Sequence, residues 1–329
     1  MNSVLYASFA FLIIFSSTTF ANSNVFQNNM DITDLINNKI KENTIVKIPA
    51  GNFKVNAEKS IVLKNNVTIE MSPETILNVI PNNKNSYQVF KIHNVSNVRI
   101  SGGTILGDKY THLGKDGEWG MGIEIKDSQH IYISNMNINK MWGDAIYVGS
   151  NGKYNNNNIF LESIKMNDNR RQGISIVSAR NLYIKNILIR NTGGAAPGSG
   201  IDIEPNNSKA ILKNLNFDNI KTMNNKGIGI QTTLKEYKGS LEPVSIYINN
   251  HTDIGSGFGL LVNGVDSKVN GSISVANTNY KMNKHSNLCF SKWENSKFIV
   301  NLEKVDNDKQ FYFGKWCGDF RKNRQVKFK

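Results

Sequence analysis

A short apolar strand pattern, a small residue followed by alternating aliphatic residues, recurs along the middle of the chain at intervals of 23 to 32 residues. The copies begin at Gly122, Ala145, Gly173, Gly200, Gly227 and Gly259. Two further short apolar runs follow most copies, separated by polar, Asn-rich turns, so each repeat predicts three short strands. One such unit cannot bury its apolar face alone, whereas stacked units bury a continuous core.

This repeat predicts an all-β fold, a parallel β-helix, in which equivalent strands of successive repeats lie about 4.8 Å apart. A leucine-rich repeat is the main alternative, but its Leu/Asn consensus is absent, and a β-sandwich would not produce three strands per repeat. Asparagines at the turns, such as Asn186, Asn214 and Asn219, are expected to adopt left-handed backbone or to stack in ladders.

The two ends of the repeat region predict caps. Residues 31–42 carry apolar side chains at helical spacing, with Asp31 as the candidate N-cap, which predicts a helical cap over the open edge. Beyond Asn279 the repeat fades, so we divide the chain into residues 1–21, a β-helix with its N-terminal cap over 22–279, and a β-rich C-terminal cap over 280–329. A carbohydrate-binding appendage is the alternative for the last part. Cys289 and Cys317 either pair there or stay free.

Residues 1–21 are interpreted as a secretory signal, because residues 5–15 are mostly apolar and Ala21 offers a small residue for cleavage. An N-terminal anchor is the alternative, although the apolar run is short for a span. We therefore expect a secreted or periplasmic protein without stable membrane insertion. The net charge of +13 favours a polyanionic partner, and after export an acidic polysaccharide is favoured over nucleic acid. The base composition of the source genome is an alternative reason for the lysines.

Several motifs resemble the right-handed parallel β-helix proteins of the pectin lyase-like superfamily. They are the N-terminal helix, residues 48–51 (IPAG), 142–149 (WGDAIYVG), 169–176 (NRRQGISI) and 200–206 (GIDIEPN), and the resemblance covers roughly residues 30–280. It implies a polysaccharide bound in a groove along one sheet, and activities that range over lyases, hydrolases, epimerases and tailspike depolymerases.

The departures from the polygalacturonase branch argue against that activity. The Asp-Asp pair of that branch is matched only by Gly143-Asp144, its His-Gly pair is replaced by Gln172-Gly173, and its Arg-x-Lys strand has no match. Asp144 and Gln172 nevertheless stand where the resemblance implies working residues.

Alignment of the first strand of each repeat stacks the outward side chains in columns, because residues two apart share a face. One column reads Glu124, Tyr147, Ser175, Asp202, Gly229, and the next reads Lys126, Gly149, Val177, Glu204, Gln231. We take the candidate catalytic residues to be Asp144, Asp202, Glu204 and Arg171, and the candidate substrate-binding residues to be Trp142, Tyr147, Arg170, Gln172, Glu124 and Lys126. The alternative is that these side chains are simply solvated.

Three chemistries fit this cluster. Asp202 and Glu204, about 6.6 Å apart by strand rise, suit glycoside hydrolysis. In β-elimination or epimerisation of a uronan, Arg170, Arg171 or Lys126 would act as base or neutralise the substrate carboxylate. Asp202 and Glu204 could instead hold Ca²⁺, although no cofactor is required. We thus expect a secreted enzyme that cleaves an acidic polysaccharide, with a non-catalytic glycan-binding or surface-structural protein as the alternative.

Overall fold

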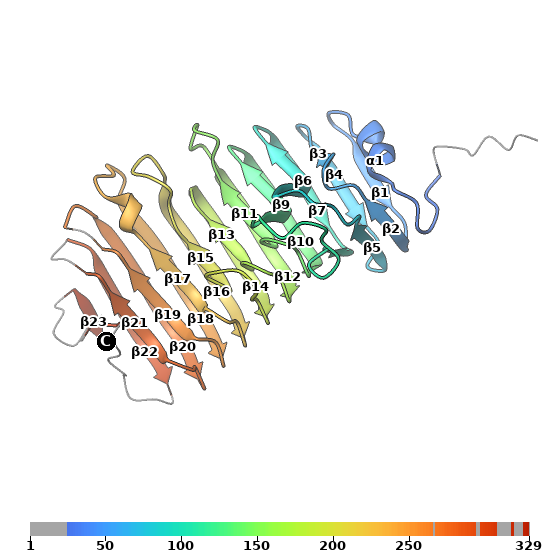
Figure 1. Cartoon of the computed structure of the whole chain (residues 1–329). Coiled ribbons are helices and arrows are strands. Elements are labelled where there is room, and N and C mark those ends of the chain that lie inside the picture. The colour runs from blue at the N-terminus through green and yellow to red at the C-terminus, as the bar shows by residue number, and fades with distance from the viewer. Residues whose placement is uncertain (1–24, 266, 294–296, 308–316, 319–324, 329) are drawn as a thin grey trace, which may run out of the picture.

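The computed structural model describes residues 25–265, 267–293, 297–307, 317–318 and 325–328. In this part of the chain the strands form one elongated stack of coils, with the helix α1 (Thr33–Lys39) at one end and β23 at the other (Figure 1). The predicted signal segment, residues 1–21, lies outside the described residues. None of the helices in the described ranges is long and apolar enough to cross a membrane.

Two parallel sheets make up the stack. The larger, 14-stranded sheet contains β1 (Ile45–Ile48), β2 (Gly51–Val55), β4 (Thr68–Met71), β5 (Thr75–Val79), β7 (Ser96–Ser101), β8 (Thr104–Leu106), β10 (Gln129–Asn139), β12 (Asn157–Asn167), β14 (Ala179–Arg190), β16 (Leu212–Met223), β18 (Val244–Ile254), β20 (Gly271–Lys281), β22 (Ile299–Asn307) and β23 (Val326–Phe328). The smaller, 9-stranded sheet contains β3 (Ile61–Val62), β6 (Ser86–His93), β9 (Trp119–Lys126), β11 (Ile146–Gly149), β13 (Ile174–Ile176), β15 (Ile201–Ile203), β17 (Ile228–Thr233), β19 (Phe258–Asn263) and β21 (Ser286–Ser291). A short 3-10 helix, η1 (Lys235–Tyr237), precedes β18.

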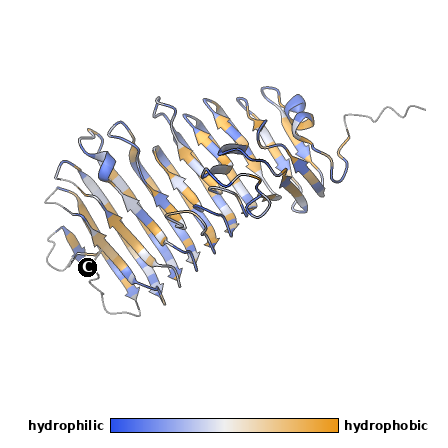
Figure 2. Ribbon diagram, in the orientation of Figure 1, coloured by the Kyte–Doolittle hydropathy of each residue, from blue (hydrophilic) through white to orange (hydrophobic). Residues whose placement is uncertain are grey.

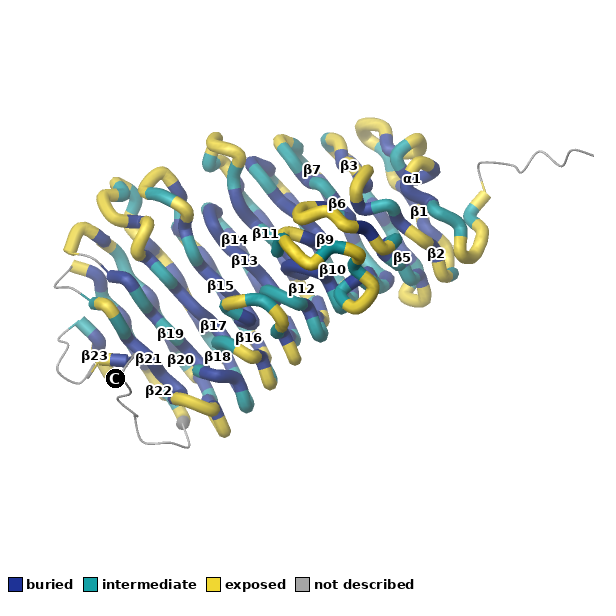
Figure 3. Tube along the Cα trace, in the orientation of Figure 1, coloured by how far each residue is buried: buried dark blue, intermediate teal, exposed yellow. Residues whose placement is uncertain are grey.

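Successive copies of the repeat pair in parallel, which confirms the predicted β-helix. Ile174 pairs with Ile201, and Ile176 with Ile203, and all four side chains are fully buried. The apolar and buried positions form a continuous interior along the coils (Figures 2 and 3). The core is therefore a stack of aliphatic layers, one layer per coil, as the repeat requires.

The second and third apolar runs of a repeat form one bent strand rather than two strands. β14 spans both runs, and Asn186 lies between them at φ +55°. Asparagine tolerates this left-handed conformation better than most residues. Asn219 Nδ2 donates to Asn186 Oδ1 across 2.7 Å, and Asn214 Nδ2 donates to Asn181 Oδ1 across 2.6 Å. Both the left-handed turns and the asparagine ladder are thus confirmed.

The ends of the stack differ in detail from the predicted segments. Helix α1 begins at Thr33, and its N-cap residue is Ile32, so the expectation of Asp31 at the N-cap was wrong; the Thr33 backbone N–H nevertheless donates to Asp31 Oδ1. The parallel ladder runs past Asn279, because β21 pairs with β19 and β22 pairs with β20. The change of pattern at Asn279 therefore does not end the ladder, and the capping roles of the two ends stay predictions. Cys289 and Cys317 form a disulfide.

Candidate functional site

The candidate residues lie on the outer face of the smaller sheet, where the strand register stacks them in a column. Tyr147 pairs with Glu124 and with Ser175, and Ser175 pairs with Asp202. Beyond Asp202 the column continues to Gln231, not to Gly229. The expected column was wrong at this point by two residues. A two-residue shift keeps the inward and outward faces unchanged, so the apolar pattern alone does not detect it.

Gly229 lies next to a buried polar cluster inside the coil. A Cβ atom added to Gly229 would lie 2.4 Å from Asp253 Oδ2 and 2.8 Å from Thr222 Oγ1. Asp253 is fully buried there and accepts hydrogen bonds from the hydroxyls of Thr222 and Ser256. The absence of a side chain at Gly229 leaves room for this internal polar cluster.

A pocket of about 270 Å³ opens over the column. Its lining residues are Trp119, Tyr147, Arg171, Ser175, Val177, Asp202, Glu204 and Asn206. Four of them, Tyr147, Arg171, Asp202 and Glu204, were predicted as site residues. Trp119 and Asn206 were missed, because Trp119 precedes the first copy of the repeat and Asn206 follows the fourth, outside the alternating positions. Trp119, with half of its surface exposed, adds an aromatic ring to the pocket rim.

Asp144, which is fully buried, forms an ion pair with Arg171, which lines the pocket. Arg171 Nη1 lies 2.9 Å from Asp144 Oδ2, which also accepts a hydrogen bond of 2.7 Å from Ser175 Oγ. Burial raises the pKa of Asp144 to about 6, against the opposing effects of Arg171 and Ser175. Burial alone would lower the pKa of Arg171, but Asp144 and the neighbouring carboxylates outweigh it and raise that pKa. Arg171 therefore stays protonated, which suits charge stabilisation and not a role as base.

Asp202 is the most perturbed acid of the pocket. Its side chain accepts a hydrogen bond of 2.9 Å from Gln172 Nε2, and its Oδ1 atom has no hydrogen-bond partner. Burial and the charge of Glu204 raise the pKa of Asp202 to about 8, although Arg171 lowers it. This carboxyl group is consequently protonated at neutral pH and has a proton to donate.

Glu124 and Lys126 lie beside the pocket on β9. Glu124 Oε2 lies 2.6 Å from His93 Nε2, and Glu124 Oε1 lies 2.7 Å from Lys126 Nζ. Burial raises the pKa of Glu124, but hydrogen bonds from His93 and Lys126 outweigh burial and lower it. Lys126 Nζ lies 5.3 Å from the centre of the Tyr147 ring. This cluster extends the polar floor from the pocket toward β6.

Trp142 and Arg170 lie outside the pocket lining and hold a loop. The Trp142 ring is stacked between the His112 ring, at a centroid distance of 4.1 Å, and the Arg170 guanidinium, at 3.8 Å. Arg170 Nη1 also donates to the carbonyl of Gly117 across 2.9 Å. These contacts hold the loop of residues 107–118 beside the site. Trp119 follows this loop directly in the sequence. Direct contact of Trp142 and Arg170 with a substrate stays a prediction.

No group of three or more His, Cys, Asp or Glu side chains that could hold a metal occurs within the described ranges. Asp202 and Glu204 are two acidic groups that line one pocket, and calcium binding by them stays a prediction.

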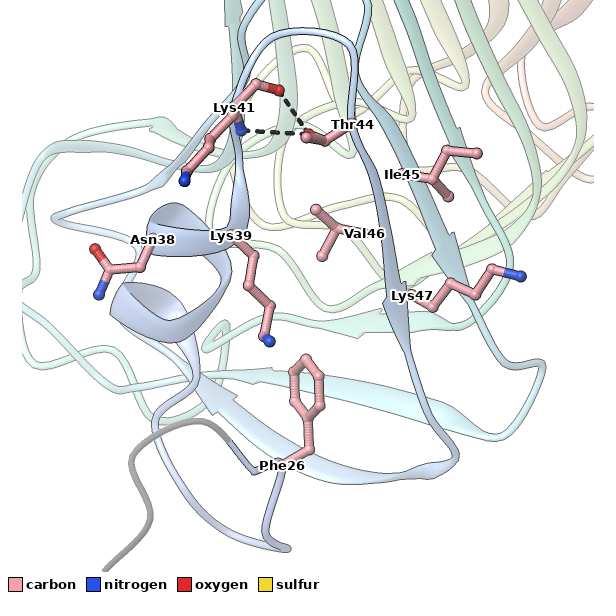
Figure 4. Close-up of a pocket in the computed structure, with 8 residues that line it drawn as sticks. All are labelled: Phe26, Asn38, Lys39, Lys41, Thr44, Ile45, Val46 and Lys47. Atoms are coloured by element: carbon pink, nitrogen blue, oxygen red, sulfur yellow. Dashed lines mark hydrogen bonds between the residues drawn. The ribbon is translucent and has the colours of Figure 1, made fainter.

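A second pocket lies between α1 and β1 at the N-terminal end (Figure 4). Its lining is Phe26, Asn38, Lys39, Lys41, Thr44, Ile45, Val46 and Lys47. This lining is basic and contains no carboxylate, so it lacks the acid–base pair found at Asp202.

Comparison with protein-family models gives no match. Two curated relatives from Bacillus subtilis (strain 168) match about half of the chain. The uncharacterized protein YclG is 33% identical over 159 residues, which is 44% of this chain and 27% of YclG. The SPbeta prophage-derived uncharacterized protein YorA is 28% identical over 188 residues, 49% of this chain and 32% of YorA. The chain therefore matches about a third or less of the length of these relatives.

Solved structures resemble most of the chain. The tailspike protein gp49 of Acinetobacter baumannii bacteriophage Fri1, described as a capsular polysaccharide depolymerase, has a TM-score of 0.57 at 14% identity, over 92% of this chain and 60% of gp49. PfbA, a surface adhesin of Streptococcus pneumoniae, has a TM-score of 0.53 at 14% identity, over 84% of this chain and 74% of PfbA. A Family 28 exopolygalacturonase of Yersinia enterocolitica has a TM-score of 0.50 at 13% identity, over 84% of this chain and 67% of that enzyme. At these identities the likeness concerns the fold.

Proposed function

We propose that this chain, which has the right-handed parallel β-helix fold of the pectin lyase-like superfamily, is a secreted enzyme that cleaves an acidic polysaccharide. The observation that carries the proposal is Asp202, a buried carboxyl group with a pKa of about 8 that opens into a polar pocket. A carboxyl group that keeps its proton at neutral pH is what general acid catalysis of glycoside cleavage requires. The similarity of the coils to gp49 and to the exopolygalacturonase supports a polysaccharide as substrate.

The residues divide into distinct roles in hydrolysis. Asp202 donates its proton to the oxygen of the bond that breaks. Glu204 lines the same pocket and acts as the second carboxylate, which activates water or attacks the sugar. Arg171 lines the same pocket as both acids and supplies a permanent positive charge. Asp144 holds Arg171 through their 2.9 Å ion pair and is a positioning residue.

An elimination in which Arg171 is the base is disfavoured by the protonation of Arg171. Elimination requires a base next to the substrate, whereas the carboxylates around Arg171 raise the pKa of its guanidinium. A protonated arginine neutralises a substrate carboxylate but does not remove a proton. Secretion is supported by the Cys289–Cys317 disulfide, which fits an oxidising compartment.

The test is incubation of the purified chain with a panel of uronans and bacterial capsular polysaccharides. We expect new reducing ends without the ultraviolet absorbance of an unsaturated sugar, and we expect Asp202→Asn to abolish them while the far-UV spectrum is retained. Appearance of that absorbance would assign a lyase instead. Binding without any cleavage would assign a non-catalytic glycan-binding protein, a reading that the likeness to the adhesin PfbA supports.

A further inference from the structure

We infer that the outer face of the smaller sheet binds a mixed polysaccharide, in which an acidic sugar binds over β6 and β9 and neutral sugars bind over β17 and β19. This inference rests on the proposed function. It comes from the register of the smaller sheet, which arranges mainly cationic side chains on one side of Asp202 and uncharged side chains on the other.

The side toward the N-terminus is cationic. Lys91 pairs with Glu124, and His93 pairs with Lys126. Lys64 follows β3, whose Val62 pairs with Lys91. Glu124 is the one carboxylate among these floor positions, and it already binds His93 and Lys126. The floor here consequently keeps a net positive charge, which favours a carboxylate on the ligand.

The Tyr147 ring, which lines the pocket, forms an aromatic surface where the pocket meets this cationic floor. Gly149 is the partner of Lys126, and a Cβ atom added to it would lie 2.3 Å from Tyr147 Cε1. The Tyr147 ring therefore lies over Gly149, with Lys126 Nζ 5.3 Å from its centre. A ring next to an ammonium group offers an apolar surface for the face of a sugar and a charge for its carboxylate.

The side toward the C-terminus carries no formal charge at the equivalent described floor positions. Gln231 pairs with Leu261, and Thr233 pairs with Asn263. Gln231 Nε2 donates to Thr233 Oγ1 across 3.2 Å, while Ser291 Oγ donates to Asn263 Oδ1 across 2.9 Å. Amide and hydroxyl groups match sugar hydroxyls as donors and acceptors. A sugar carboxylate bound over β17 and β19 would lose its hydration without gaining an ionic interaction with a cation at these positions.

The disulfide limits the uncharged side. Cys289 follows Leu261 in the column, and its side chain is joined to Cys317. The backbone N–H of Gly318 donates to the carbonyl of Phe290 across 2.8 Å. Residues 317–318 therefore lie against β21, so β17 and β19 supply the uncharged floor between Asp202 and this contact.

The test measures binding by calorimetry to the full chain carrying Asp202→Asn, which removes the proposed acid and prevents cleavage. The probes are oligogalacturonate as an all-acidic polymer, xylo-oligosaccharide as a neutral one, and hyaluronan plus acidic capsular polysaccharides as mixed ones. We expect at least one mixed polymer to bind ten times more tightly than both homopolymers. Addition of Lys91→Gln or Lys126→Gln should weaken that binding about tenfold, whereas Lys221→Gln on the larger sheet should leave it unchanged.

Two outcomes overturn the inference alone. One is binding of oligogalacturonate at least as tight as that of every mixed polymer, and the other is an equal effect of Lys221→Gln and Lys91→Gln. If no polymer is bound, and the wild-type chain cleaves none, the proposed function fails together with the inference.

Discussion

Gln172 forms hydrogen bonds both to Asp202, the acid of the pocket whose pKa is raised most, and to the backbone of the next coil. Its Nε2 atom donates to Asp202 Oδ2 across 2.9 Å, and its Oε1 atom accepts from the Ser199 N–H across 2.8 Å. Because Ser199 N–H can only donate, the orientation of the Gln172 amide is determined, and its donor must face Asp202. Gln172 is fully buried, so neither bond is replaced by water.

Replacement of Gln172 by leucine should destabilise the protein. The change leaves Asp202 Oδ2 and the Ser199 N–H without these partners, and each unsatisfied buried group costs about 1–3 kcal/mol. We expect urea denaturation to show a free energy of unfolding lower by about 2–6 kcal/mol. Gln88→Leu is the matched control, since the Gln88 amide bonds only to the exposed Ser86 hydroxyl. Equal losses in the two variants would contradict the role of Gln172.

Asp202→Asn should stabilise the protein in a pH-dependent way. The folded pKa of Asp202, about 8, lies above the ordinary value of 3.8, so between these values the folded state binds more protons than the unfolded state. Its stability therefore falls as pH rises from about 4 to 8. Each pKa unit corresponds to about 1.4 kcal/mol, and the asparagine should raise the free energy of unfolding at pH 8 by a few kcal/mol but hardly at pH 4.

Thermal unfolding at both pH values checks this prediction, with the exposed Asp116→Asn as control. A variant that is no more stable than the wild type at pH 8 would show that Asp202 is not held in a site unfavourable to its charge.

The cleavage rate on any polysaccharide substrate should fall as pH rises through about 8. Asp202 loses its proton in this range, and a general acid without its proton no longer assists the leaving group. The pH profile of kcat/KM measures this effect. A rate that instead increases through pH 8 would assign Asp202 as a base.

The disulfide should add measurable stability. Cys289 and Cys317 are 28 residues apart, and closure of a loop of this size stabilises a fold by roughly 3–4 kcal/mol through the unfolded state. Cys317→Ser, or reduction with dithiothreitol, should lower the free energy of unfolding by about this amount. The serine variant should no longer respond to dithiothreitol, which serves as the internal control.

The asparagine ladder offers a test of the turns. Asn219→Ala removes the 2.7 Å bond to Asn186 and forces alanine into a left-handed position at φ +54°. The lost hydrogen bond costs about 1 kcal/mol, and the backbone strain adds about 1–2 kcal/mol. Asn219→Gly loses the bond without the strain, so we expect it to unfold with a smaller loss than the alanine variant. Equal losses would mean that backbone strain contributes nothing there.

The chemistry of the site was only partly predictable. Alternation along the strands was sufficient to group Tyr147, Asp202 and Glu204 on one face, and the turn before the strand supplied Arg171. Trp119 was missed because it lies outside the alternating positions. Trp142 was expected in the groove, yet it is stacked between His112 and Arg170, a contact made by a loop whose path the repeat does not describe.

The amino-acid repeat was enough to predict the stack of parallel coils, because a period of three apolar runs with asparagine turns buries its apolar face only when copies are stacked. It also determined which side chains leave the core, since alternation does not depend on the neighbouring coil. The pairing of Asp202 with Gln231 rather than Gly229 is visible only in the folded chain, because a shift of two residues leaves that alternation unchanged. The tertiary structure likewise decided the protonation of Asp202, which depends on burial and on the charges of Glu204 and Arg171 together.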